Sequence, residues 1–150
     1  MSIRYFSHVG ICVSDLDRST RFYQEVFGFQ EVMTAQVGNE FAATLEIDAP
    51  KLESRILGRD DVRIELLHYL APGYLGDGSR RPMNQLGLTH LAFAVDDVTE
   101  LFEATERAGG QVHHETLSVA EQLGSDEEVP LKTVYLTDPD GTRIELISGM

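Results

Sequence analysis

Two stretches of this chain occur twice, and this internal repeat limits the folds open to the chain more than any other feature of its sequence. The segment His8-Val-Gly-Ile-Cys-Val-Ser-Asp-Leu resembles His90-Leu-Ala-Phe-Ala-Val-Asp-Asp-Val, 82 residues further on. The segment Arg63-Ile-Glu-Leu-Leu recurs as Arg143-Ile-Glu-Leu-Ile, 80 residues further on. Two independent matches at nearly one offset indicate a duplicated module. We expect the boundary between the copies in the loop from Ala71 to Gly87.

Each copy is expected to form one strand, a helix and three further strands, which is an α+β arrangement. The predicted strands cover 5–13, 29–36, 51–58 and 62–69 in the first copy and 88–95, 111–117, 131–137 and 142–148 in the second. Between the first two strands of each copy, apolar residues recur at helical spacing. Polar residues that predict an N-cap and a glycine that predicts a left-handed C-cap flank each helix: Ser14, Asp15 and Gly28 in the first copy, and Asp96, Asp97 and Gly109 in the second.

The remaining segments define the predicted domain organisation. Residues 40–48 have no counterpart in the second copy and are expected to be an insertion that holds a short helix. Residues 71–87 and 118–130 are expected to be long loops. The prediction is a first βαβββ module at 1–70, a connecting loop at 71–87 and a second module at 88–150, within one compact domain.

Strand alternation places one histidine of each copy on the sheet face that points away from the helix. In the first strand, His8 shares a face with Gly10 and Cys12, while the large apolar residues share the other face. In the fifth strand, His90 likewise lies beside two alanines. In both copies the small neighbours leave room next to a histidine.

A glutamate occupies the equivalent face of another strand in each copy. Glu65 and Glu145 interrupt strongly apolar strands, where an ionised carboxylate is costly unless it is paired, hydrogen-bonded or bound to a metal. Each glutamate could instead pair with Arg63 or Arg143, and a single histidine is often an ordinary core or surface residue. Because His and Glu recur together in both copies, we predict one divalent-metal site with four ligands: His8, Glu65, His90 and Glu145.

The charge of the chain excludes two classes of partner. Its 25 Asp and Glu residues against 12 Lys and Arg residues give a formal net charge of −13, which repels nucleic acid and anionic membranes. Cys12 is the only cysteine, so a disulfide within the chain and a cysteine-rich zinc site are both excluded. The N-terminus resembles no signal peptide, and no apolar run is long enough to span a membrane, so we expect a cytoplasmic protein.

As a set, these motifs resemble the vicinal oxygen chelate superfamily, which includes glyoxalase I, methylmalonyl-CoA epimerase, extradiol dioxygenases and bleomycin-resistance proteins. The resemblance spans nearly the whole chain and rests on five segments: His8-Val-Gly-Ile, Asp17 to Phe29, Arg63-Ile-Glu-Leu, Thr89-His-Leu-Ala-Phe, and Asp138-Pro-Asp-Gly-Thr-Arg-Ile-Glu-Leu. It implies two βαβββ modules whose sheets curve into an open cup around one divalent metal ion. The oxygen and nitrogen ligands predicted here fit Ni, Co, Zn, Mn or Fe. The resemblance also implies a homodimer.

The ligand order looks most like that of glyoxalase I, which takes a His and a Glu from each copy. The resemblance therefore implies a lyase or isomerase that acts on a small carbonyl substrate through a metal-bound enediolate or enolate, with Glu145 or Glu65 as the catalytic base. An enzyme like methylmalonyl-CoA epimerase is one alternative, although that family usually has a glutamine where this chain has Glu65. A non-enzymatic protein that sequesters a ligand, as bleomycin-resistance proteins do, is the other.

Four further residues are candidates for substrate contacts: Tyr5, Cys12, Tyr69 and Arg81. Tyr69 is expected on the face of Glu65, whereas His68 is expected on the opposite face. Arg81, in the loop at 71–87, could meet an anionic substrate. Cys12 and Tyr69 occupy positions where bacterial glyoxalase I usually has an arginine and an asparagine that touch glutathione. This difference argues against glutathione and leaves the substrate open.

Overall fold

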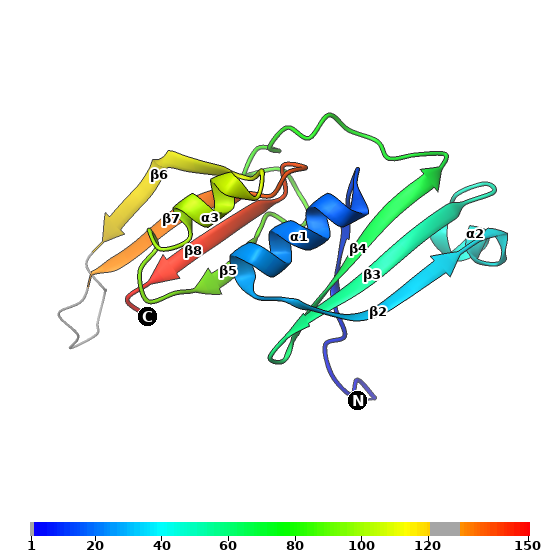
Figure 1. Cartoon of the computed structure of the whole chain (residues 1–150), viewed down its shortest axis with the longest axis horizontal. Coiled ribbons are helices and arrows are strands. Elements are labelled where there is room, and N and C mark those ends of the chain that lie inside the picture. Colours follow the sequence, from blue (N-terminus) through cyan, green and yellow to red (C-terminus); the bar gives the residue numbers. More distant parts are fainter. Residues whose placement is uncertain (1, 121–129) are drawn as a thin grey trace. The chain divides into compact units, whose positions relative to one another are not determined.

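The computed structural model describes residues 2–120 and 130–150 of the chain. The chain forms two compact units, Met1–Gly76 and Asp77–Met150, and each is built around one four-stranded sheet (Figure 1). Residues 77–87, which the sequence assigned to a connecting loop, belong to the second unit.

The first unit contains the elements β1 (Val9–Cys12), α1 (Leu16–Phe27), β2 (Gln30–Val37), β3 (Lys51–Arg59) and β4 (Val62–Ala71). The strand order in its sheet is β1-β4-β3-β2, with β1 parallel to β4 and the other pairs antiparallel. The predicted insertion holds a short 3-10 helix, η1 (Asn39–Phe41), followed by α2 (Ala42–Leu45).

The second unit repeats this plan with β5 (Leu91–Ala94), α3 (Phe102–Arg107), β6 (Gln111–Ala120), β7 (Leu131–Thr137) and β8 (Arg143–Ser148). Its strand order, β5-β8-β7-β6, matches that of the first sheet position by position, and β5 is again parallel to its neighbour. The predicted duplication of a βαβββ module is therefore confirmed.

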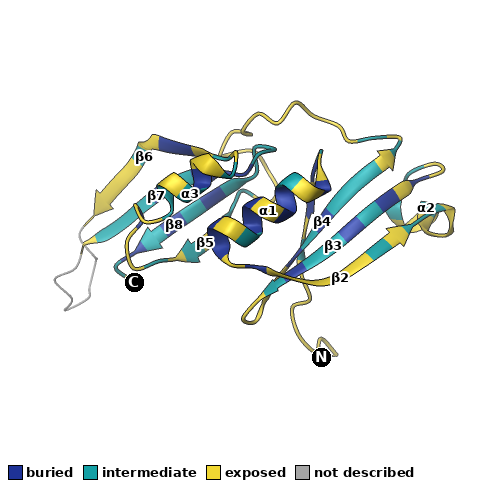
Figure 2. Ribbon diagram, in the orientation of Figure 1, coloured by how far each residue is buried: buried dark blue, intermediate teal, exposed yellow. Residues whose placement is uncertain are grey.

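One face of the first sheet is covered by α1, and the core of the unit lies between them (Figure 2). Phe22, Tyr23 and Phe27 of α1 are almost fully buried and pack against one another, Phe22 meeting Tyr23 edge to face with ring centroids 5.3 Å apart. From the sheet, Ile64 and Leu66 of β4 are buried on the same side. Burying each such side chain contributes roughly 1.5–3 kcal/mol. Glu65, between these two residues, points to the opposite face.

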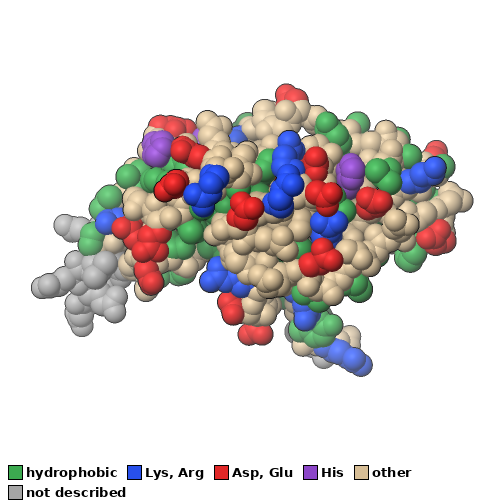
Figure 3. Space-filling model, viewed as in Figure 1, with side chains coloured by type: hydrophobic (Ala, Val, Ile, Leu, Met, Phe, Trp, Pro, Cys, Tyr) green, Lys and Arg blue, Asp and Glu red, His purple; other side chains and the backbone are tan. Residues whose placement is uncertain are grey.

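On the face seen in Figure 3, acidic and basic side chains are interspersed and do not form a patch of one sign.

The two helices begin differently, although the sequence predicted equivalent N-caps. The Asp15 carboxylate accepts a hydrogen bond of 2.9 Å from the backbone N–H of Arg18 and caps α1, which ends at Gly28 with φ +70°. In the second unit, Asp97 accepts from the backbone and hydroxyl of Thr99 and caps a turn, so the N-cap predicted at Asp96 or Asp97 is wrong. Thr99 stabilises this turn in place of a helical one, and α3 starts only at Phe102.

Three strand limits also differ from the prediction. β1 begins at Val9 and β5 at Leu91, so the histidine before each lies at the entrance of the strand rather than inside it. β6 continues to Ala120 because residues 118–120 pair with β7, which corrects the start of the loop predicted at 118–130. Residues 121–129 of that predicted loop lie outside the described part of the chain.

The antiparallel edge strand of each sheet, β2 in the first and β6 in the second, contains a β-bulge. In β2, the pairing with β3 skips Val32. In β6, residues 114–117 lie opposite only Val134 of β7, between the pairs His113–Tyr135 and Ser118–Thr133. The Thr116 hydroxyl closes this bulge, since it donates to the His113 carbonyl at 2.7 Å and accepts from the Tyr135 N–H at 2.8 Å.

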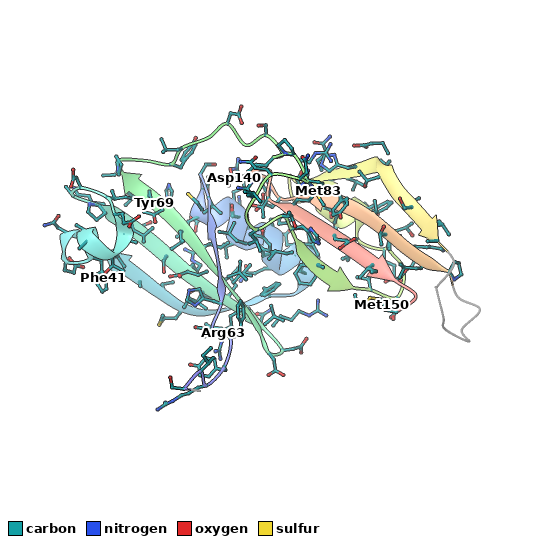
Figure 4. All side chains as sticks on the ribbon, turned by 180° about the vertical axis from the view of Figure 1, so that it is seen from behind. Phe41, Arg63, Tyr69, Met83, Asp140 and Met150 are labelled. Atoms are coloured by element: carbon teal, nitrogen blue, oxygen red, sulfur yellow. The ribbon has the colours of Figure 1, made fainter. Side chains whose placement is uncertain are left out.

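The first residues of the second unit contact the turn between β7 and β8. Figure 4 labels Asp140, which is part of this turn, and Met83, which belongs to the first residues of the unit. The Asp138 carboxylate shapes the turn by accepting from the backbone of Thr142 at 2.8 Å. Gly141 has φ +84°, and a Cβ added to it would overlap the Gly78 carbonyl. The Arg143 guanidinium donates to the Arg81 carbonyl at 2.8 Å.

Candidate functional site

The first predicted pair, His8 and Glu65, is brought together in the first unit. Glu65 reaches the face opposite α1 because its neighbours on β4 are buried beneath the helix. His8 stands at the entrance of β1, the strand that runs beside β4. Its Nε2 lies 3.0 Å from Oε2 of Glu65, and both side chains are partly exposed, at 35% and 22%.

The second predicted pair, His90 and Glu145, repeats this geometry in the second unit. Glu145 lies between Ile144 and Leu146, which are both fully buried. His90 stands at the entrance of β5, beside β8. Its Nε2 lies 3.1 Å from Oε2 of Glu145, with side-chain exposures of 25% and 18%. The carboxylates therefore pair with histidine, and the guanidinium of Arg143 is directed to the Arg81 carbonyl instead.

The two glutamates have different second partners. Oε1 of Glu65 accepts a hydrogen bond of 2.8 Å from the hydroxyl of Ser54, a buried residue of β3. Glu145 instead faces Tyr135, its direct neighbour across β7 and β8. Burial raises the pKa of Tyr135 above 10.0, and the Glu145 charge and the hydrogen bond of the hydroxyl to Glu145 add to this rise, while Arg143 opposes it.

Tyr135 is the central contact of a small aromatic cluster in the second unit. Its ring lies edge to face with that of His90, with centroids 5.6 Å apart. The Arg143 guanidinium lies 5.7 Å from the centre of the same ring, within the range of a cation–π contact. Tyr135 and Ser54 could not be predicted from the sequence, because a tyrosine or serine in a strand is an ordinary residue, and only the order of the strands places them beside a glutamate.

Each histidine also has a hydroxyl partner for its other ring nitrogen. Nδ1 of His8 lies 3.0 Å from the Ser7 hydroxyl, and Nδ1 of His90 lies 2.9 Å from the Thr89 hydroxyl. These two hydroxyl residues occupy the same place in the repeat, directly before the histidine. Aligning the copies one residue further would have revealed them.

The donor atoms of each pair suit a divalent ion. Imidazole nitrogen and carboxylate oxygen are ligands that Ni, Co, Zn, Mn and Fe accept. Two ligand atoms about 2.1 Å from one ion and at about a right angle lie about 3 Å from each other, as the Nε2 and Oε2 atoms do here. Within residues 2–120 and 130–150, no three or more His, Cys, Asp and Glu side chains form a group that could hold a metal. Each unit thus brings together one of the two predicted His–Glu pairs.

The four predicted substrate-contact residues differ in position and in exposure. Tyr69, near one end of β4 with Arg63 near the other (Figure 4), lies on the Glu65 face; burial raises its pKa above 10.0, and electrostatic interaction with Cys12 and Glu65 raises it further. Cys12 is exposed on β1. Tyr5 lies in the segment before β1 and is 67% exposed. The Arg81 guanidinium donates to the Leu88 carbonyl at 2.5 Å, within its own loop.

Comparisons with known proteins agree with this architecture. The profile of the Glyoxalase/Bleomycin resistance protein/Dioxygenase superfamily matches residues 5–146. Lactoylglutathione lyase of Haemophilus influenzae is 30% identical over 146 residues, which cover 95% of this chain and 90% of that protein.

Two solved structures share the fold. A glyoxalase family protein from Bacillus cereus superposes with a TM-score of 0.80 at 22% identity, over 99% of this chain and 95% of that one. A fosfomycin resistance protein from Listeria monocytogenes, solved with Mn(II) and a sulfate ion, superposes with a TM-score of 0.60 at 20% identity, over 99% and 94% of the two chains.

The repeated βαβββ unit with one His–Glu pair per copy defines a class of duplicated α+β proteins. This chain belongs to the Glyoxalase/Bleomycin resistance protein/Dioxygenase superfamily. Within its described residues, no helix has the length and apolar character needed to cross a membrane.

Proposed function

We propose that the protein is a divalent-metal-dependent lyase or isomerase of the glyoxalase type, which acts on a small carbonyl substrate. Its metal ligands are His8, Glu65, His90 and Glu145. The observation that carries the proposal is the equal spacing of the two pairs, 3.0 Å and 3.1 Å between Nε2 and Oε2, at equivalent places in the two units. The relative named lactoylglutathione lyase supports the reaction class, and the Mn(II) held by the Listeria protein supports a metal.

The residues of the two pairs divide the chemistry. A divalent ion bound by these residues would supply Lewis-acid stabilisation of the negative charge that develops when a C–H bond next to a carbonyl is broken. A carboxylate of Glu145 or Glu65 takes up that proton and returns it to the product. Glu65 contacts Ser54 and His8, whereas Glu145 contacts Tyr135 and His90, so the two candidate bases differ in their hydroxyl partner.

Cys12 and Tyr69 support a substrate other than a glutathione adduct. Both lie on the Glu65 side of the first sheet, at positions where bacterial glyoxalase I usually has an arginine and an asparagine that touch glutathione. This difference keeps a CoA thioester, as in an epimerase of the methylmalonyl-CoA type, as a second candidate substrate. A screen of 2-oxoaldehydes with and without glutathione, and of CoA thioesters, distinguishes the two.

The first test is metal content per chain in the native protein after reconstitution with Ni, Co, Zn, Mn and Fe. His90→Ala and Glu145→Ala are the test variants, and His68→Ala, on the opposite face of β4, is the matched control. The proposal predicts one ion per four-ligand set in the native and control proteins and its loss from both test variants. Native protein that binds none of the five ions contradicts the enzyme reading and favours a ligand-sequestering protein.

A second test asks whether the two pairs of one site come from one chain. The family resemblance implies a homodimer, in which a site takes both pairs from one chain or one pair from each. The double variants His8→Ala/Glu65→Ala and His90→Ala/Glu145→Ala each lack one pair. When the two are refolded together, metal binding returns in part if sites are shared between chains, and stays absent if each chain forms its own site.

A further inference from the structure

Three arginines of the second unit lie in or beside its first residues, and two of them already have a partner that uses the guanidinium. Arg80 pairs with Glu115 at 3.3 Å. The guanidinium of Arg81, which the sequence predicted to meet an anionic substrate, donates to the Leu88 carbonyl. The third, Arg143, donates to the Arg81 carbonyl at 2.8 Å. Within residues 2–120 and 130–150, no Asp or Glu side chain forms a salt bridge with Arg143.

Arg143 lies on the same sheet face as the His90–Glu145 pair. It precedes Glu145 by two residues on β8, so the two side chains point to one side and their Cα atoms are about 7 Å apart. The Arg143 guanidinium lies 5.7 Å from the centre of the Tyr135 ring, and this ring meets that of His90 edge to face. The positive charge of Arg143 therefore stands next to one of the two candidate bases.

The Arg143 guanidinium has hydrogen-bonding capacity to offer a ligand. It carries five N–H donors, and the Arg81 carbonyl takes one of them in a hydrogen bond that is exposed to solvent. The contacts with this carbonyl and with the Tyr135 ring hold the long side chain in place, so less conformational entropy is lost when a ligand binds. A planar guanidinium recognises a carboxylate through two parallel hydrogen bonds.

Arg63 is the equivalent residue of the first unit and lacks these contacts. It precedes Glu65 by two residues on β4, but the residue opposite Glu65 is Ile56 rather than a tyrosine. Arg63 is exposed, and within the described residues its side chain makes no hydrogen bond, salt bridge or ring contact. Of the two repeated arginines, only Arg143 is held in place beside its glutamate.

We propose that Arg143 binds a carboxylate group of the substrate and makes the protein specific for a small anionic carbonyl compound. A single guanidinium without a carboxylate partner balances one negative charge, which favours a carboxylate over a phosphate dianion. A molecule a few carbon atoms long spans the distance of about 7 Å between the Cα atoms of Arg143 and Glu145. This inference rests on the proposed function for the reacting end of the substrate, whereas carboxylate binding by Arg143 requires neither a metal nor turnover.

Nitrogen-15 NMR titration with acetate tests the carboxylate site, and acetamide serves as an uncharged probe of nearly the same shape. We expect acetate to shift the side-chain N–H signals of Arg143 and the backbone signals of β7 and β8, and acetamide to leave them unchanged. Arg143→Met keeps an apolar contact with the Tyr135 ring but removes the charge, so it should weaken acetate binding at least about 10-fold. Arg143→Lys keeps the charge without the planar pair of donors and should bind with intermediate affinity.

Two control variants separate this site from the proposed metal site. Arg63→Met makes the same change at the repeated position and should bind acetate as the native protein does. His8→Ala removes a proposed metal ligand of the first unit and should leave the acetate-induced shifts of Arg143 unchanged. Thermal unfolding of each variant checks the fold, and if Arg143→Met does not fold, the lysine variant and the comparison of acetate with acetamide decide the question.

Kinetics test the specificity on any carbonyl compound that the protein turns over. Arg143→Met should raise KM for compounds that carry a carboxylate and leave KM for their amides unchanged. Equal binding of acetate and acetamide, native acetate affinity in Arg143→Met, or an equal rise of KM for acids and amides overturns the proposal. If acetate binds through Arg143 but the protein takes up no metal, the proposed function falls and the carboxylate site stands; metal uptake without acetate binding gives the reverse.

Discussion

His113 is a buried histidine outside the candidate site, on β6 of the second unit. Its side chain is 5% exposed, and its Nε2 lies 3.2 Å from the Thr137 hydroxyl. Burial lowers the pKa of His113 below 6.5, and the positive charges of Arg80 and Arg143 lower it further, while Glu115 opposes them. The neighbouring His114 is exposed and meets Phe102 of α3 edge to face, so the two adjacent histidines face opposite sides of the sheet.

We predict that His113 lowers the free energy of unfolding of the protein as the pH falls into the mildly acidic range. Because its pKa is lower in the folded state, the unfolded chain binds its proton first, and stability is lost as the pH falls from about 6.5 to the folded pKa. Urea unfolding at pH 8 and pH 5.5 should show a smaller loss for His113→Gln than for native protein. His114→Gln is the control and should behave as native. Equal losses in all three proteins would contradict the prediction.

Gly141 and Gly28 allow the effect of a close backbone approach to be separated from that of backbone conformation. Both have positive φ, +84° and +70°, but only at Gly141 would a Cβ meet another backbone atom, the Gly78 carbonyl. Left-handed conformation costs a non-glycine residue about 1–2 kcal/mol. We predict that Gly28→Ala loses stability in this range and that Gly141→Ala loses clearly more, measured as the free energy of unfolding in urea. Equal losses would show that the turn moves away from residue 78 freely.

Among the elements, α1 and α3 differ both in length and in the role of the aspartate that precedes them. Asp15 caps the 12 residues of α1, whereas Asp97 serves a turn that precedes the 6 residues of α3. Loss of an N-cap side chain typically costs about 1 kcal/mol. We predict that Asp15→Ala lowers the free energy of unfolding by about this amount and that Asp97→Ala lowers it less. Thermal unfolding of the two variants measures the difference, and an equal or reversed order would contradict it.

The strands that the sequence predicted best are those between strong local signals. β3, β4, β7 and β8 end within two residues of prediction, because tight turns at 58–61 and 138–141 fix their hairpins. The starts of β1 and β5 were predicted too early, since apolar residues also precede the four-residue pairing of these strands with β4 and β8. The length of β6 could not be predicted, because it depends on the Thr116 hydroxyl closing a bulge against a strand that lies later in the chain.

The candidate site, like the strands, could be predicted where the signal is local in the sequence and could not where it depends on strand neighbours. The repeat placed a histidine and a glutamate on one face of each module, and the structure shows both pairs in contact. The different second partners, Ser54 for Glu65 and Tyr135 for Glu145, depend on which strand neighbours β4 or β8 and in what register. Such cross-strand neighbours have no signature in one sequence.

For the molecule as a whole, the division between the two units after Gly76 predicts where the chain tolerates added residues. A few residues further along the chain, Arg80 pairs with Glu115 at 3.3 Å, and the Arg81 carbonyl accepts a hydrogen bond from Arg143. A short Gly-Ser insertion between Gly76 and Asp77 should change the free energy of unfolding by less than about 0.6 kcal/mol. The same insertion between Arg80 and Arg81 should cost about 1 kcal/mol or more, because it separates these contacts. Urea unfolding of the two insertion variants checks the order.

The extra residues in β2 and β6 bear on how the protein behaves at high concentration. Each of these strands is the outermost strand of its own sheet on the antiparallel side, where unpaired backbone groups can template a further strand from another molecule. Val32 in β2 and residues 114–117 in β6 break the regular spacing that such templating needs. The bulges therefore protect these edges against ordered aggregation. Deleting the extra residues of either bulge would leave a regular edge strand that can pair with a strand of another molecule, even if the fold itself survived.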